Sequence, residues 1–184
     1  VDAATEVRNA HARFYGARDA DILALWDSPR QKAAYEWLAT EMPNLRNAFR
    51  WAADRGDVDT AASIATYAGF MGLWVENYEP LAWAEEMIEP ARVADSPRLA
   101  TLYACASGCY TSGRVDAAVR YTDAARDTIT TGRYDVPYGV HGYLGAAYIY
   151  SGHPEQAVEW ARSQLSRDPG VQMLASTILV LGMA

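Results

Sequence analysis

The stretch LGAAYIYSGHPEQAV, residues 144–158, decides the fold of this chain. It has an apolar helical face on each side of a Gly-His-Pro turn, so it predicts two helices joined by a short connection. Gly145 and Tyr148 lie on the face of the first helix that meets Ala157 of the second. Each apolar face needs a neighbouring helix to cover it, which is the building principle of helical repeats.

The same frame occurs again 39 residues earlier, as CASGCYTSGRVDAAV at 105–119. Ala106 and Ala118 stand at the positions of Gly145 and Ala157, and Cys109 replaces the aromatic residue. A further pair at 59–93 fits the frame loosely, because its first helix is apolar on nearly every side.

This frame, ended by Asp168 and Pro169, resembles the tetratricopeptide repeat. The period in that family is about 34 residues, and we assign the excess to the loop around 131–137. The resemblance implies an all-α fold in which antiparallel helix pairs stack into a right-handed superhelix.

Prolines and glycines mark the predicted helix ends. Ser28 and Ser96 each precede a proline, which is the pattern of an N-cap followed by the first helical turn. Gly56, Gly113 and Gly152 stand where helices should end. We therefore expect helices at 3–17, 29–42, 44–54, 59–75, 79–93, 97–112, 115–130, 137–151, 154–167 and 171–184.

The composition limits the partners of this region. The net charge is −7, the pI is near 4.9, and Lys32 is the only lysine. An acidic surface repels phosphate groups, so we expect neither nucleic acid nor an anionic membrane as a partner. No apolar run reaches the roughly 18 residues that a membrane span needs, and Cys105 and Cys109 are poorly placed for a disulfide. These features predict a cytoplasmic protein.

A second resemblance begins at WLATEMPNLRNAFRWAADRGD, residues 37–57. This segment resembles the junction between the ATPase module and the helical repeats in large bacterial regulators of actinobacterial type. That family includes LuxR-type transcriptional regulators with a signal-transduction (STAND) ATPase core and relatives that carry an adenylate cyclase domain. Residues 21–38 are more similar to the cyclase-bearing branch.

The same junction has a physical interpretation. Leu38, Leu45 and Phe49 keep one helical phase straight through Pro43, so we expect the proline to kink or briefly break a helix without changing its buried face. Asn44 is placed to cap the second part.

The resemblance implies two regions. Residues 1–57 would be a helical linker or capping segment that follows an absent ATPase module, and 58–184 would be repeats truncated at the C-terminus. We expect a piece of a longer protein, because Val1 stands in place of an initiator Met and an apolar helical pattern runs through 171–184.

No catalytic constellation is present in the sequence. It lacks a phosphate-binding loop of the Gly-x-x-x-x-Gly-Lys-Ser/Thr type, a Gly-x-Ser-x-Gly elbow and a His-Glu-x-x-His pair. Cys105, Cys109 and His141 would supply only three ligands for a metal, so the cysteines are better explained as small apolar residues. Glu85, Glu86 and Glu89 are expected to form a solvated helix face. We therefore predict no cofactor, no metal and no enzymatic activity of this region itself.

Aromatic residues form the candidate site. In tetratricopeptide stacks the first helix of each pair lines the concave surface, and this register implies a wall made of Tyr67, Met71, Trp74, Tyr103, Ser107, Tyr110 and Tyr150. Aromatic rings with polar tips suit a surface that meets a peptide or a small molecule. The alternative is that these rings pack against adjacent helices or against missing repeats.

These patterns favour a signal-sensing or protein-interaction region of a multidomain transcriptional regulator. Its partners would be the ATPase and effector domains of the same polypeptide and a protein or small-molecule signal. The alternative is a structural scaffold or self-assembly arm without a ligand of its own.

Overall fold

The chain forms α-helices and one 3-10 helix, with no strand among the residues that the structure describes. This structure is a computed structural model that describes residues 2–134, 136, 141–165 and 178–183, without the side chains of 141–143, 164 and 165. Over this part of the chain, the predicted all-α fold is confirmed.

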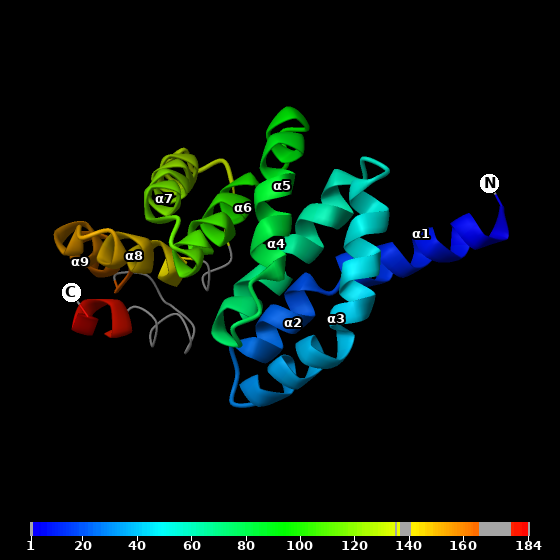
Figure 1. Ribbon diagram of the computed structural model, residues 1–184, viewed down its shortest axis with the longest axis horizontal. Coiled ribbons are helices and arrows are strands. Elements are labelled where there is room, and N and C mark those ends of the chain that lie inside the picture. Colours follow the sequence, from blue (N-terminus) through cyan, green and yellow to red (C-terminus); the bar gives the residue numbers. More distant parts are fainter. Residues whose placement is uncertain (1, 135, 137–140, 166–177, 184) are drawn as a thin grey trace.

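Figure 1 shows α1 at one end of the molecule and α8 and α9 at the other. Residues 178–183 are also helical. The elements are α1 (Ala3–Gly16), α2 (Asp19–Trp26), α3 (Gln31–Ala53), α4 (Val58–Trp74), α5 (Glu79–Val93), α6 (Leu99–Ala106), the 3-10 helix η1 (Ser107–Ser112), α7 (Val115–Thr130), α8 (His141–Tyr150) and α9 (Pro154–Leu165).

Each helix from α3 to α9 contacts the next one along the chain. A second set of contacts skips one helix, because α4 touches α6 and α6 touches α8. At the N-terminal end, α1 and α2 both contact α3 and α4. The first helices of the predicted pairs, α4, α6 and α8, therefore form a continuous row, and α1 and α2 cover the free side of α4.

Most predicted helices agree with the structure to within a few residues, and the glycine ends are confirmed. Gly56, Gly113 and Gly152 have φ angles of 70°, 79° and 81°, a left-handed conformation that glycine adopts without strain. The predicted helix at 97–112 is divided into α6 and η1. The predicted helical residues at 137–140, 166–167 and 171–177 lie outside the described residues.

Helix α2 was not predicted from the sequence. Its eight residues hold Ile22 and Trp26 in the core, where the Trp26 ring meets the Phe70 ring edge-on with centroids 4.7 Å apart. Ser28 and Ser96 lie close to helix starts, but each hydroxyl accepts a hydrogen bond from the backbone N–H two residues later. The helices begin one residue beyond that N–H, at Gln31 and Leu99.

Helix α3 runs without interruption through Pro43. Figure 1 shows it bending near its middle, as expected where a proline removes a backbone donor. Asn44 therefore does not cap a second helix, and that prediction is wrong. Its amide donates instead to Glu41 Oε2 at 2.8 Å, and the same oxygen accepts a hydrogen bond from the Tyr15 hydroxyl of α1 at 2.5 Å.

One large core connects the elements. Its buried side chains extend from Ala12 in α1 to Trp160 in α9. The core is continuous across the predicted boundary at residue 57, because Phe49 of α3 and Ile64 of α4 belong to the same cluster. The segment before residue 57 is thus packed on the first predicted repeat.

Candidate functional site

The predicted aromatic wall does not exist as one surface. Tyr67, Met71 and Ser107 are completely buried. The Tyr67 hydroxyl donates to the backbone oxygen of Tyr15 at 3.0 Å, and the Ser107 hydroxyl donates to that of Ala104 at 2.6 Å. Helix α1 covers Tyr67, since α4 is packed against α1 and α2 as well as α3, α5 and α6, and Ser107 lies in η1, which contacts α6, α7 and α8. These three residues therefore belong to the core.

The remaining four predicted residues retain some exposure. Trp74 ends α4 and is 42% exposed, while Tyr103 is partly buried on α6 with its ring centroid 6.5 Å from that of Tyr121. Tyr110 lies on η1 and Tyr150 ends α8. Of the whole set, the structure brings Tyr110 and Tyr150 into direct contact.

The rings of Tyr110 and Tyr150 stack face to face, with centroids 4.8 Å apart and planes inclined by 17°. Tyr150 is 55% exposed, so one side of the stack is open. Burial raises the pKa of Tyr110, and the nearby phenols of Tyr150 and Tyr78 raise it further. We call Tyr78, Tyr110 and Tyr150 the tyrosine cluster.

Tyr78 was missed by the sequence reasoning. It precedes α5 and is 41% exposed, next to the exposed Val75 at the end of α4. The available signal was its position in a turn between two predicted helices, where large apolar side chains are unusual. The turn is tight at Gly72, since a Cβ there would lie 2.5 Å from the backbone oxygen of Asn77.

The position of Tyr110 depends on the change from α-helix to 3-10 helix. Hydroxyls of Ser107, Thr111 and Ser112 each donate to a backbone oxygen three residues earlier, within the tighter turn. Gly108 permits close packing, because a Cβ there would lie 3.1 Å from a methyl group of Leu81. The segment that carries Tyr110 is thus held against α5.

The two cysteines lie in the core. Cys105 Sγ is 3.3 Å from the backbone oxygen of Thr66, and Cys109 Sγ is 3.5 Å from that of Arg114. Burial raises the pKa of Cys105 to about 12 and also raises that of Cys109. Thiols with raised pKa values are poor nucleophiles and poor metal ligands at neutral pH. The side chain of His141 lies outside the described residues.

Glu86 and Glu89 are exposed on α5, as predicted, and acidic residues of this helix also form ion pairs with other segments. Glu79 and Glu86 each form a two-pronged ion pair with an arginine of α3, namely Arg46 and Arg50. Glu85 forms a similar pair with Arg114, the residue before α7. The face expected to be merely solvated therefore connects α5 to α3 and to the following pair.

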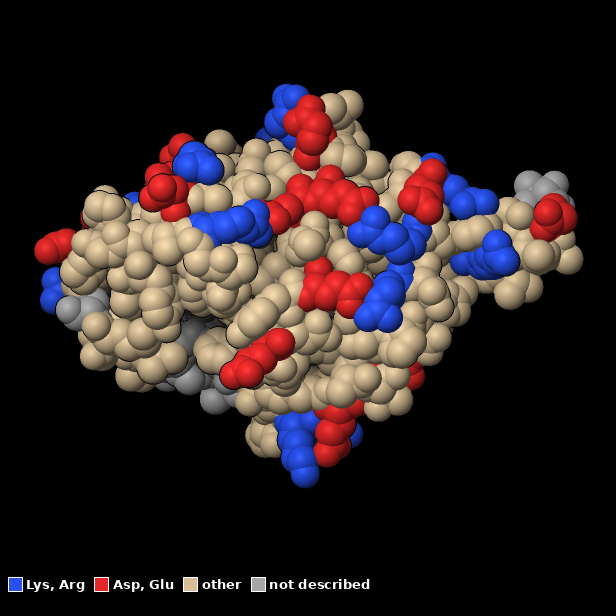
Figure 2. All heavy atoms as spheres, viewed as in Figure 1, with Lys and Arg blue, Asp and Glu red and all other residues tan. Residues whose placement is uncertain are grey.

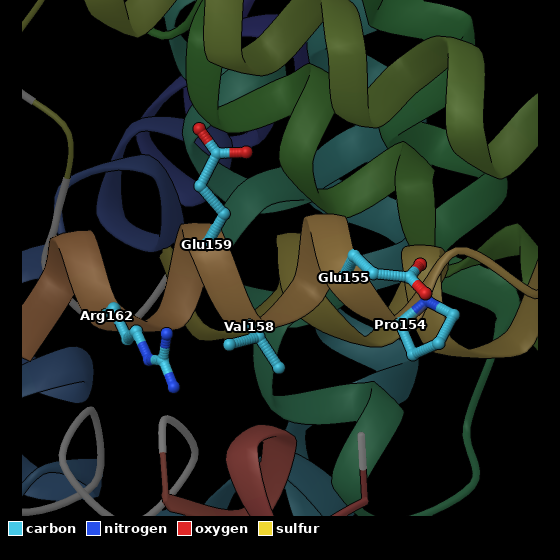
Figure 3. Close-up of a pocket in the computed structure, with 5 residues that line it drawn as sticks. All are labelled: Pro154, Glu155, Val158, Glu159 and Arg162. Carbon is cyan, nitrogen blue, oxygen red and sulfur yellow. The ribbon is translucent and has the colours of Figure 1, made fainter.

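Two hollows in the surface lack convergent chemistry. One of about 480 Å³ lies along α9, and Figure 3 shows Glu159 pointing away from Val158 and Arg162, so its charged groups do not meet. The other, of about 520 Å³, lies between α1 and α3. Its lining residues are Val7, Arg8, His11, Asn47, Arg50, Trp51 and Asp54.

The charge distribution adds a further observation. On the face shown in Figure 2, basic and acidic side chains lie next to one another, without a broad patch of one sign.

Within the described ranges, no three His, Cys, Asp or Glu side chains are placed to hold a metal ion. None of the helices in the described part of the chain is long and apolar enough to cross a membrane.

The tyrosine cluster is thus the described feature that best fits a contact site, since it combines exposed aromatic area with a fixed geometry. The chain matches no protein-family model, no curated protein and no solved structure.

Proposed function

We propose that this chain is the partner-binding region of a multidomain regulator, and that the tyrosine cluster is where a peptide segment of a partner protein binds. The observation that carries the proposal is the half-open stack of Tyr110 and Tyr150. The stack connects the C-terminal ends of the first helices of two successive predicted pairs. In a repeat array, equivalent parts of neighbouring repeats form one continuous surface.

The repeat architecture belongs to this proposal. We infer antiparallel helix pairs stacked as a tetratricopeptide-like right-handed superhelix. Support comes from the row of first helices α4, α6 and α8, and from Ala118 and Ala157, which are both fully buried at their frame positions. The left-handed glycines Gly113 and Gly152 end the first helix of each pair at equivalent places.

The chemistry of the cluster suits a peptide. A tyrosine ring provides flat apolar area at a small entropic cost, and its hydroxyl can exchange hydrogen bonds with a backbone. Exposed Trp74 and Val75 precede Tyr78 and extend the apolar area on the same turn. Grouped exposed aromatic residues on a protein surface are typical of contact sites.

The regulator part of the proposal depends on the resemblance at 37–57. In the parent polypeptide, ATPase or adenylate cyclase chemistry would lie outside this chain, and this region would transmit binding to those domains without catalysing a reaction or contacting nucleic acid. The sequence of the parent polypeptide tests this directly. A phosphate-binding loop on the N-terminal side is expected, and a parent without an ATPase or cyclase domain would contradict the regulator assignment.

The binding part can be tested with a random-peptide display library selected on the immobilised 184-residue chain. We expect enriched peptides that bind in solution and that slow hydrogen exchange at 72–78, 107–112 and 147–152. Protection of these three segments together would locate the peptide on the tyrosine cluster. Failure to enrich any peptide, or protection confined to other segments, would contradict the proposal.

A further inference from the structure

The outer face of α1 carries a second, separate apolar surface. Val7 is 68% exposed and Phe14 is 55% exposed, and both Ala3 and Ala10 are exposed beside them. We call these four residues the α1 outer stripe. Their spacing alternates between four and three residues, which is the spacing of a coiled-coil seam.

The opposite face of α1 explains why this stripe faces outward. Ala12 and Tyr15 are buried, and α1 contacts α3 and α4 through that side. Figure 1 shows the N-terminal part of α1 extending beyond α3, away from the rest of the molecule. Val7 also lines the hollow between α1 and α3, so a second helix on the stripe lies at the rim of that hollow.

We propose that the α1 outer stripe is a self-association surface, occupied by α1 of a second copy of this chain lying antiparallel to the first. This role is independent of the tyrosine cluster, since it uses the other end of the molecule.

Side-chain size supports a second copy as the occupant. In the antiparallel register that places Phe14 opposite Ala3 of the second copy, Val7 lies opposite Ala10. Each large residue then faces an alanine, and the two-fold symmetry repeats both contacts. Alternation of large and small side chains is what lets two helices pack closely.

Charge supports the same register. Glu6 and Arg13 flank one side of the stripe, and neither has an ion-pair partner within the described part of the chain. The register that matches the apolar residues also places Glu6 beside Arg13 of the second copy, twice by symmetry. A second copy of α1 therefore complements the α1 outer stripe in side-chain size and also in charge.

The interface should be weak. A helix of 14 residues is about 21 Å long, and a pair of them forms an interface near the lower limit of about 1,000 Å² for specific association. We expect a reversible dimer with a dissociation constant of about 10–100 µM. Sedimentation equilibrium of the 184-residue chain should therefore give a mass that rises from monomer to dimer with concentration.

Two charge reversals test the register. Glu6→Arg and Arg13→Glu each place like charges together twice, so each variant alone should dimerise about tenfold more weakly. A one-to-one mixture of the two variants restores both attractive pairs, because one copy then carries only arginine and the other only glutamate at these positions. The mixture should recover the affinity of the parent chain.

Lys32→Glu is the matched control, because it makes the same change in net charge as Arg13→Glu at an exposed position of α3. It should dimerise like the parent, and circular dichroism should show unchanged helicity in every variant. A parent chain that stays monomeric at several hundred micromolar would overturn the proposal. So would reversals without effect, or a mixture no tighter than its components.

Discussion

Ala157 and Ala118 have no exposed surface, and each lies at the position where the repeat frame requires a small side chain. Ala157 packs with Tyr148 of the preceding helix and with Val180 near the C-terminal end. A larger side chain at this position has no space to fill, so neighbouring side chains must leave their preferred rotamers.

We therefore predict that Ala157→Leu lowers the free energy of unfolding by about 1–3 kcal/mol. Gln156→Leu is the matched control, because it introduces the same side chain one residue earlier at an exposed position. Urea denaturation of both variants measures the difference. Equal stability of the two would mean that Ala157 does not lie at a tight helix contact.

Tyr15 and Tyr148 are among the buried groups whose raised pKa values make stability depend on alkaline pH. Burial and the hydrogen bond to Glu41 raise the pKa of Tyr15 from 10.0 to about 12. Burial and the hydrogen bond to Asp123 raise that of Tyr148 to about 12, although the guanidinium of Arg126 opposes the shift. In the unfolded chain these phenols lose their protons near pH 10. Their contribution is thus complete below pH 10 and is lost as the pH rises towards 12.

We predict a free energy of unfolding that falls steadily from about pH 10 to about pH 12. Tyr148→Phe keeps the ring but removes the ionisable group, so the variant should lose stability less steeply over this range. A Tyr148→Phe slope identical to that of the parent would contradict the assigned environment of Tyr148.

At the scale of elements, α3 continues through an interior proline. Pro43 lies in its interior, where it removes one backbone hydrogen bond, but its side chain is exposed and fills no space in the core. The helix persists because residues on both sides of the proline, Leu38 and Leu45 among them, are fully buried. The free energy gained by burying these residues therefore exceeds the free energy lost with the backbone hydrogen bond that Pro43 removes.

Pro43→Ala should consequently raise the free energy of unfolding, by up to about 3 kcal/mol. Pro154→Ala is the matched control, since Pro154 begins α9 and its missing N–H breaks no helical hydrogen bond there. Thermal melts followed by circular dichroism compare the two. A less stable Pro43→Ala variant would show that the bend in α3 is itself needed for packing.

Most helices could be predicted from sequence because their ends are marked locally, as at Gly113 and at the proline that begins α9. Helix α2 could not, because its eight residues give too short a pattern and its order depends on Trp26 packing against Phe70. The change from α6 to the 3-10 helix at Ser107 could not be predicted either. It depends on the close packing of Leu81 against Gly108 and on hydroxyl groups that favour the tighter turn.

The candidate site was predicted in part. Tyr110 and Tyr150 follow from the repeat frame, which places both on the same side of successive first helices. Tyr67 and Met71 obey the same rule but are buried, because α4 is packed against α1, α2, α3, α5 and α6. No local pattern in the sequence predicts this packing. Which apolar face of a helix stays open is decided by tertiary packing.

At the scale of the whole molecule, the two ends differ in character. The N-terminal end places the α1 outer stripe on a helix that extends from the body, whereas the tyrosine cluster lies where α8 and η1 meet. The ion pairs of α5 with Arg46, Arg50 and Arg114 connect the segments between them. Binding at one end and self-association at the other can therefore coexist.

We propose that the tyrosine cluster binds a partner and is not needed for folding. The direct measurement is the affinity of a selected peptide, by fluorescence anisotropy, together with the melting temperature of each variant. Tyr110→Ser with Tyr150→Ser should abolish binding and cost much less stability than the about 3–5 kcal/mol lost when a core aromatic is removed. Tyr67→Ala should do the reverse, with strongly reduced stability and retained binding below its melting temperature. A double variant that melts as low as Tyr67→Ala, or that still binds the peptide, would contradict the claim.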